Sequence, residues 1–362
     1  YGVVASFRDT ARGRDVAIKR VRRVFDNFLV LRRTLREIRL MRHFRHPNLM
    51  RLYKVLPIEQ STGDLHLALE LMDCDLDTLV HAKHVRLSDR QCRRFCVQML
   101  LGLQQLHAGH VIHRDLKPAN IFVRLADCQV KIGDLGLSRG IAVDGDTGEA
   151  AHPLREQLTE YVVTRWYRAP EVLLARSRYG PPVDVWAVGC ILYEMCALKV
   201  PFDAPDLKTL IKKITQGPTP ELPAGFSEEL RSLLTELLDR ESTNRPAASE
   251  ILKRPLVQDA VRRMLEEVKS EEDAAKADPA KKAPAAPKAP AAVPGKDYAE
   301  RAGSYEKAAL VEYYSPTHGE WLPATVTNVD AEGRIMLNVK PNVWLSLDLQ
   351  GQRVRPREGA AT

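Results

Sequence analysis

Short apolar runs are separated by a polar stretch within residues 1–25, and a helical spacing of apolar residues follows. Two short apolar runs, 3–5 and 16–18, flank a polar stretch at 8–14, which predicts a strand, a turn and a second strand. Apolar residues then recur at the spacing of one helix face, at Leu31, Leu35, Ile38 and Met41. We therefore expect two strands followed by an amphipathic helix with arginines on its polar side.

Strand-like runs return at 49–56 and 65–71, and helical patterns dominate from residue 88 onward. Short strands are expected near Ile121 and Val130. A small strand-rich part followed by a larger helical part predicts two lobes with a cleft between them.

The pattern changes again near the C-terminus. Residues 269–300 form an Ala/Lys/Pro-rich tract that cannot bury a core, and we expect a semi-extended linker there. Three short strand-like runs follow at 310–314, 321–326 and 335–339, separated by turn residues. Residues 305–357 are therefore predicted to form a small all-β module, an SH3- or Tudor-like barrel.

Composition and net charge favour some classes of partner over others. Hydrophobic residues make up 44% of the chain and charged residues 28%, as in globular proteins. The net charge of +7 favours acidic or phosphorylated partners and is too modest to indicate nucleic acid. The longest apolar run, 185–193, is about half of a membrane span, so no membrane partner is expected.

The cysteines match no metal-binding spacing and indicate ordinary reduced thiols, as in a cytoplasmic and/or nuclear protein. They are Cys74, Cys92, Cys96, Cys128, Cys190 and Cys196.

Three separated motifs carry the chemistry. A lysine, Lys19, closes the second predicted strand in the stretch Val-Ala-Ile-Lys. The stretch His-Arg-Asp-Leu-Lys-Pro-Ala-Asn occupies residues 113–120, and Asp-Leu-Gly occupies 134–136. In this order and spacing the motifs resemble those of the protein kinase family over residues 1–268. The resemblance implies an α+β, two-lobed kinase fold, and Lys-Pro at 117–118 is similar to serine/threonine kinases.

The resemblance implies a role for each charged motif residue. Lys19, held by Glu37, would bind the α- and β-phosphates of ATP. Asp115 would orient the substrate hydroxyl and accept its proton, with Lys117 near the transferred phosphate. The Mg²⁺ ligands would be Asn120 and Asp134. The remaining ATP contacts would be made by Val4, Ala17, Leu69, Glu70, Leu71, Met72 and Phe122.

The segment 158–168 resembles mitogen-activated protein kinases with a Thr-Glu-Tyr switch. An upstream kinase would phosphorylate Thr159 and Tyr161, adding roughly −3 to −4 charge that must meet arginines. The resemblance implies that Thr164 braces the catalytic residues and that substrates carry proline after the target. The phosphate-binding arginines would be Arg36, Arg114 and Arg139 for phosphothreonine, and Arg165 and Arg168 for phosphotyrosine.

Other stretches resemble a second group. Residues 119–122 and 195–265 are more similar to NIMA-related kinases, so a Ser/Thr kinase without a proline requirement is an alternative.

The chain has no initiator Met and matches only the end of the glycine-rich loop, so we expect a truncated sequence. An inactive scaffold acting through its C-terminal module is a further alternative. If the chain begins at Tyr1, the sheet of the smaller lobe would have an exposed edge where its missing first strand belongs.

Further pairings follow from the resemblance. Glu171 is expected to pair with Arg245, and Asp184 to receive the catalytic-loop backbone. In the C-terminal module, four aromatic residues could cage a methylated lysine or bind a peptide. They are Tyr313, Tyr314, Trp321 and Trp344.

Overall fold

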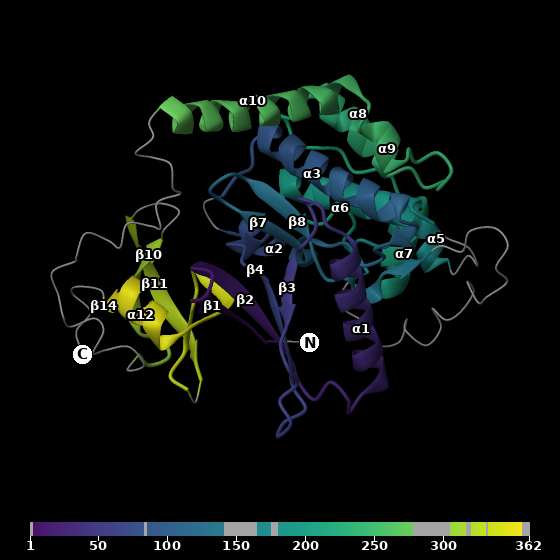
Figure 1. The fold of residues 1–362 in the computed structure, drawn as a ribbon. Coiled ribbons are helices and arrows are strands. Elements are labelled where there is room, and N and C mark those ends of the chain that lie inside the picture. Colours follow the sequence, from purple (N-terminus) through teal and green to yellow (C-terminus); the bar gives the residue numbers. More distant parts are fainter. Residues whose placement is uncertain are drawn as a thin grey trace. The chain divides into compact units, whose positions relative to one another are not determined.

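The structure is a computed structural model of the 362-residue chain. It describes residues 3–82, 85–140, 165–174, 180–277, 305–315, 320–330 and 332–356. The chain divides into two compact units (Figure 1). A strand-rich unit comprises Tyr1–Leu31, Arg51–Met72 and Glu267–Thr362, and a helical unit comprises Arg32–Met50 and Asp73–Glu266.

The strand-rich unit begins with an antiparallel sheet. Its strands are β1 (Val3–Asp9), β2 (Arg14–Val21), β3 (Leu52–Val55) and β4 (Leu65–Glu70), in the order β1-β2-β4-β3. Gly13 has φ +63° in the turn between β1 and β2, a conformation that glycine adopts without steric cost. The predicted strand–turn–strand at the N-terminus is therefore confirmed.

The C-terminal residues of the same unit form a second group of strands. These are β10 (Leu310–Ser315), β11 (Glu320–Val329), β12 (Ile335–Leu337), β13 (Lys340–Leu345) and β14 (Val354–Pro356), with helix α12 (Leu347–Arg353) before β14. The strand order is β14-β10-β11-β12-β13, and β14 ends it, so no closed barrel is formed by the described residues. The strands of the predicted module are present, but the SH3- or Tudor-like barrel is not confirmed.

A single apolar cluster forms the core of these C-terminal strands. It comprises Tyr305, Val311, Tyr313, Ala324, Val326, Ile335, Leu337, Leu345 and Val354. The outer edge of β1 is paired as well, because β13 runs parallel to it with Trp344 opposite Ala5. The expectation that this edge is exposed is therefore wrong at that position.

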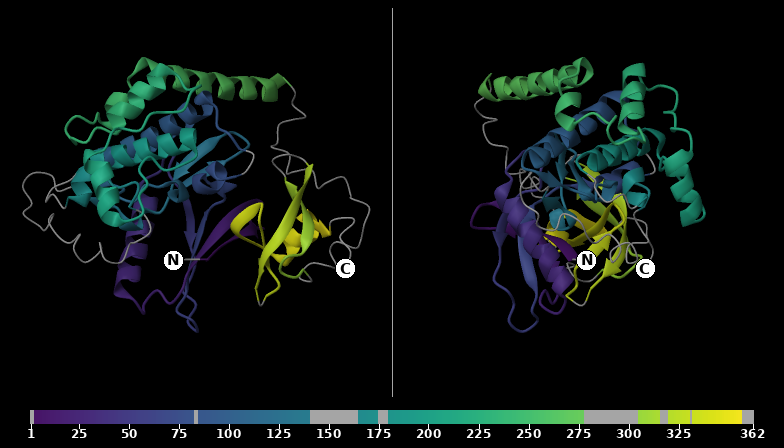
Figure 2. Two further views of the ribbon diagram at one scale, coloured as in Figure 1. Left: turned by 180° about the vertical axis from the view of Figure 1, so that it is seen from behind. Right: turned by 90° about the vertical axis from the view of Figure 1, so that its right-hand side faces the viewer.

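The helical unit is built around two long helices. Helix α3 (Asp89–Ala108) starts with a capping box in which Ser88 and Gln91 satisfy each other's backbone N–H groups. Helix α6 (Pro182–Ala197) is buried at every residue from 183 to 196. The two helices lie side by side in Figures 1 and 2. The apolar run at 185–193 is therefore a core helix.

The other elements of the helical unit surround this pair. The helices are α1 (Phe28–His43, whose first turn belongs to the strand-rich unit), α2 (Leu76–Val80), α5 (Pro170–Leu173), α7 (Leu207–Gln216), α8 (Glu228–Leu237), α9 (Ala248–Ile251) and α10 (Pro255–Ala277, which belongs to the strand-rich unit from Glu267 onward). The short strands are β5 (Cys74–Asp75), β6 (Val111–Ile112), β7 (Ile121–Arg124), β8 (Gln129–Ile132) and β9 (Arg139–Gly140), and the 3-10 turns are η1 (Pro118–Asn120) and η2 (Leu135–Leu137). Helix α10 extends to Ala277, into the tract expected as a linker, and residues 278–304 lie outside the described residues. No helix in the described part of the chain is long and apolar enough to cross a membrane.

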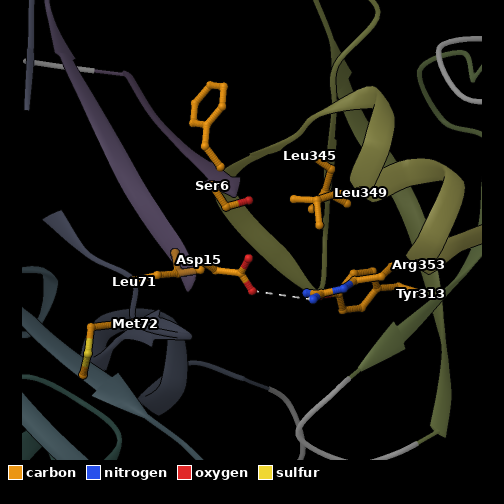
Figure 3. A pocket seen from close by; sticks show the side chains of 9 residues that line it. Ser6, Asp15, Leu71, Met72, Tyr313, Leu345, Leu349 and Arg353 are labelled. Carbon is orange, nitrogen blue, oxygen red and sulfur yellow. Dashed lines mark ion pairs between the residues drawn. The ribbon is translucent and has the colours of Figure 1, made fainter. Parts of the chain in front are cut away.

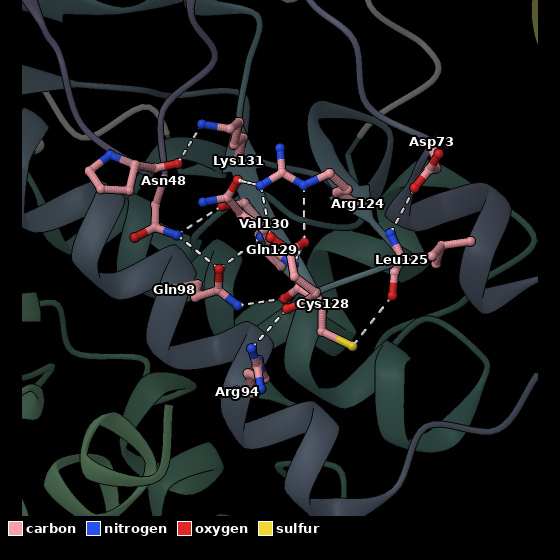
Figure 4. A network of polar contacts seen from close by, with 12 residues as sticks. Asn48, Asp73, Arg94, Gln98, Arg124, Leu125, Cys128, Gln129, Val130 and Lys131 are labelled. Atoms are coloured by element: carbon pink, nitrogen blue, oxygen red, sulfur yellow. Dashed lines mark hydrogen bonds and ion pairs between the residues drawn. The ribbon is translucent and has the colours of Figure 1, made fainter. Parts of the chain in front are cut away.

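A buried polar network fixes α3 to strand β8 and to the segment after α1 (Figure 4). The amide nitrogen of Asn48 donates to Gln98 Oε1 at 3.0 Å and to the Val130 carbonyl at 2.9 Å. Gln98 also accepts from the Val130 N–H and donates to the Cys128 carbonyl, both at 2.8 Å. Because buried amides need all their partners, this network specifies how α3 and β8 are positioned.

Candidate active site

One face of the β1–β2–β4 sheet gathers four residues that were expected to bind the nucleotide. Val4 pairs with Lys19 across β1 and β2, and Ala17 pairs with Leu69 across β2 and β4. Directly paired residues of antiparallel strands share a face, and so do residues two apart on one strand. The strand register therefore brings Val4, Ala17, Lys19 and Leu69 onto a single surface.

Three further residues of the expected set lie at the end of β4 or directly after it. Glu70 ends the strand, and Leu71 and Met72 line a small pocket of the strand-rich unit (Figure 3). The pocket is also lined by Ser6, Phe7, Asp15, Tyr313, Leu345, Leu349 and Arg353. The Asp15 carboxylate lies 3.9 Å from the Arg353 guanidinium. Sequence reasoning missed this neighbourhood, because no motif near residue 72 indicates that the C-terminal strands lie beside β1.

The helical unit holds a compact polar loop between β6 and β7. The side-chain amide of Asn120 donates to the main-chain oxygen of Asp115 at 2.7 Å and to its Oδ2 at 3.2 Å. The ammonium of Lys117 lies 3.1 Å from the same Oδ2. The 3-10 turn η1 starts with Pro118, whose fixed φ suits the first position of such a turn. The structure thus brings together three residues that the sequence analysis expected to be catalytic.

The buried carboxylate of Asp184 accepts hydrogen bonds from the backbone of this loop. The N–H groups of His113 and Arg114 donate to the two oxygens of Asp184, each at 2.8 Å. His107 Nε2 lies 2.9 Å from the same carboxylate. The expected role of Asp184 as acceptor of the loop backbone is confirmed. His107 was missed, and its only sequence signal is its position in the last turn of α3.

Two non-glycine residues at this site have a left-handed backbone. Arg114 has φ +72° and Asp134 has φ +55°. Such conformations cost of order 1–3 kcal/mol and persist where the surroundings enforce them. His113 contributes, since its Nε2 lies 2.9 Å from the carbonyl oxygen of Gly133. These two strained backbone conformations indicate that contacts with neighbouring residues set the geometry of the site.

The donor set suits a magnesium ion. The Asn120 nitrogen is used by Asp115, which leaves the amide oxygen as the atom that can bind a cation. Asp134 is the N-cap residue of η2, and its side chain makes no capping hydrogen bond. Oxygen ligands of this kind are those that Mg²⁺ prefers.

The arginines expected to bind phosphate lie among the described residues, but part of the chain around them does not. Arg36 donates to the Gly136 carbonyl at 2.6 Å, and burial, followed by the charges of Arg32, Arg114 and Arg33, lowers the pKa of its guanidinium. A bound anion would offset the repulsion among these guanidinium groups. Arg139 lies in β9, where it pairs with Ile112 of β6, and its guanidinium donates to the Ser138 carbonyl at 3.1 Å.

Part of the segment 158–168 lies outside the described residues. This holds for Thr159, Tyr161 and Thr164. Arg165 and Arg168 are described, and the Arg168 N–H donates to the Arg165 carbonyl at 3.2 Å in a turn that precedes α5.

Two buried pairs anchor this turn and the helix α5 that follows it. Arg245 donates to both oxygens of Glu171, at 2.9 and 2.6 Å, which confirms the expected ion pair. The Tyr167 hydroxyl donates to Glu194 at 2.6 Å. Burial, together with the Glu194 charge, raises the pKa of Tyr167, and burial also raises the pKa of Glu194. The Tyr167–Glu194 pair was missed, because neither residue belongs to a motif that the sequence analysis used.

Comparison with known proteins agrees with this geometry. Residues 1–257 match the family model described as protein kinase domain. Among curated proteins, the chain is 38% identical over 278 residues to extracellular signal-regulated kinase 1 of Dictyostelium discoideum, a match that covers 73% of this chain and 50% of the relative. It is 39% identical over 218 residues to mitogen-activated protein kinase 4a of Physcomitrium patens, covering 60% of this chain and 55% of the relative.

A third relative is covered more fully. Mitogen-activated protein kinase 14 of Arabidopsis thaliana is 38% identical over 278 residues, which are 73% of this chain and 73% of the relative. The chain spans about half the length of the first two relatives.

Proposed function

The chain belongs to the protein kinase family, and from that premise we propose that it transfers the γ-phosphate of ATP to serine or threonine side chains of proteins. The observation that carries the proposal is the Asp115–Lys117–Asn120 arrangement, in which one carboxylate is held by an amide and an ammonium. Phosphoryl transfer requires positioning and charge neutralisation, which these groups can supply.

Each residue of the loop has a distinct part in the proposed reaction. Asp115 orients the attacking hydroxyl and takes its proton, while Lys117 neutralises charge on the transferred phosphoryl group. Asn120 and Asp134 hold Mg²⁺, which acts as a Lewis acid toward the phosphate oxygens when it is bound.

The proposal assigns nucleotide binding to the residues that the sequence analysis named. Lys19, supported by Glu37, binds the phosphates. Val4, Ala17 and Phe122 enclose the adenine, and Leu69, Glu70, Leu71 and Met72 contact its edge. The shared sheet face of Val4, Ala17, Lys19 and Leu69 supports this assignment.

We further propose a preference for proline after the target residue and activation by an upstream kinase at Thr159 and Tyr161. The relatives named mitogen-activated protein kinases support this choice over a NIMA-related specificity. Arg36, Arg114 and Arg139 would receive phosphothreonine, and Arg165 and Arg168 phosphotyrosine, with Thr164 bracing the loop. The position of Arg36 supports the first pocket, since burial and then the neighbouring charges of Arg32, Arg114 and Arg33 lower its pKa.

The proposed organisation is a kinase domain over residues 1–268, a linker over 269–300 and a β module over 305–357 with a peptide or methyl-lysine ligand. The proposed location is cytoplasmic and/or nuclear.

A positional peptide library with radiolabelled ATP tests the activity. The chain, phosphorylated at Thr159 and Tyr161, should label peptides with proline after Ser or Thr. Asp134→Asn should abolish the labelling. Labelling without a proline requirement would favour the NIMA-related alternative. No transfer above the Asp134→Asn control would overturn the enzyme proposal and leave the scaffold.

A further inference from the structure

The C-terminal strands carry a row of side chains on the face opposite their core. The register places Tyr314 directly opposite Trp321, and Glu312 between Pro323 and Arg355. Paired residues share a face, and these alternate along β10 with the core residue Tyr313. We call Tyr314, Trp321 and Pro323 the aromatic ridge. Pro323 is exposed, and Tyr314 and Trp321 are half-buried.

Contacts along the row hold the rings in place. The rings of Tyr314 and Trp321 meet edge to face with centroids 5.5 Å apart. The Arg355 guanidinium lies 4.2 Å from the Trp321 ring centroid and is held there by Glu312 at 2.6 Å. A cation already occupies the position over the indole, and its charge is neutralised by Glu312. This favours a neutral, apolar ligand over a methylated lysine, and the burial of Tyr313 removes one of the rings expected in a cage.

The same chain carries a segment with matching chemistry. Pro284, Pro287 and Pro290 recur every three residues. A polyproline II helix has three residues per turn, so in that conformation the three rings would line one edge. Aromatic surfaces bind such edges, and the low conformational entropy of proline reduces the cost of binding. We call these residues the proline stripe.

The tether permits binding within one chain. Pro290 lies 20 positions before Leu310, the first residue of β10. An extended chain of that length reaches about 66–72 Å, which is ample for a return to the neighbouring strand. A tether of this length gives an effective concentration on the order of millimolar, so weak contacts suffice.

We propose that the aromatic ridge binds the proline stripe of the same chain. The inference specifies the peptide ligand proposed for the C-terminal module. Its test measures no phosphate transfer, so its failure is distinguishable from failure of the proposed kinase activity.

The test uses the full chain with ¹⁵N-labelled tryptophan. The chain has four tryptophans, and Trp321→Phe identifies the Trp321 indole resonance. Replacing the stripe in Pro284→Ala/Pro287→Ala/Pro290→Ala should shift this resonance. Pro279→Ala/Pro294→Ala, which changes prolines outside the three-residue spacing, should leave it in place. A synthetic peptide of residues 281–292 should return the resonance of the triple variant toward its original position.

Three results would overturn the proposal. One is a Trp321 resonance that is the same in the triple variant and the original chain. Another is a triple variant that does not respond to the peptide at concentrations on the order of millimolar. The third is a resonance position in the original chain that depends on protein concentration, since that indicates exchange between molecules.

Discussion

Gly133 shows how one residue shapes the candidate site. A Cβ at this position would lie 2.6 Å from Cε2 of Phe122, so the ring occupies the space that a side chain would take. The Gly133 N–H also donates to the Asn120 carbonyl at 2.9 Å. The absence of a side chain therefore lets Phe122 pack against the backbone directly before Asp134.

We predict that Gly133→Ala displaces the Phe122 ring and weakens ATP binding. The KM for ATP should rise by about tenfold, equivalent to about 1.4 kcal/mol. Phe122→Leu in the same chain should recover part of the loss, because it vacates the space. Gly140→Ala is the matched control, since its Cβ meets nothing nearer than 3.9 Å. An unchanged KM in Gly133→Ala would contradict the adenine role of Phe122.

The ion pair of Glu171 and Arg245 is a second residue-scale feature. Both side chains are almost inaccessible, at 4% and 0% exposure, so removing one partner leaves a buried charge. Arg245→Met should lower the free energy of unfolding by about 3–5 kcal/mol in urea. Glu171→Leu/Arg245→Met should be more stable than Arg245→Met alone.

The control for this prediction is the partly exposed Arg254–Glu236 pair, with exposures of 34% and 37%. Arg254→Met should cost no more than about 1 kcal/mol. If the two arginine variants lose equal stability, burial does not determine the strength of the Glu171–Arg245 pair.

At the scale of elements, the segment after α1 couples folding to pH. Nδ1 of His46 accepts the Asn48 N–H at 3.1 Å, which requires that this nitrogen be unprotonated. Burial, and then the charge of Lys131, lowers the pKa of His46 below its usual 6.5. Asn48 belongs to the network that joins α3 to β8, so protonation of His46 acts on that junction.

The sign of the effect follows from proton linkage. When the folded pKa is lowered, the unfolded chain binds more protons between the two pKa values. Stability is therefore highest above about pH 6.5 and falls as the pH decreases toward the folded pKa. His46→Gln should reduce the slope of unfolding free energy against pH in this window. An identical slope in the variant would show that other groups cause it.

For the whole molecule, local motifs predicted the helical unit better than the arrangement of the C-terminal strands. The contacts of Asp115 with Lys117 and Asn120 could be predicted because these residues lie within a few positions of sequence. The contact of Asp184 with the loop backbone spans about 70 positions and could be predicted only from the family resemblance. The pairing of Ala5 with Trp344 could not, since it joins positions 339 apart that share no pattern. Tyr313 was expected at a ligand surface but lies in the core, because strand alternation fixes its side only once the register is known.

The central claim is that Asp115 positions and deprotonates the substrate hydroxyl, and Asp115→Asn tests it most directly. The substitution keeps the shape of the side chain and removes its charge. With a Ser-Pro peptide and the activated chain, kcat should fall by about 10²–10⁴-fold while the KM for ATP is unchanged. The matched control is Asp127→Asn, since Asp127 is paired with Arg124 in the β7–β8 turn and should keep kcat at its original value. An Asp115→Asn chain that retains its kcat would contradict the account.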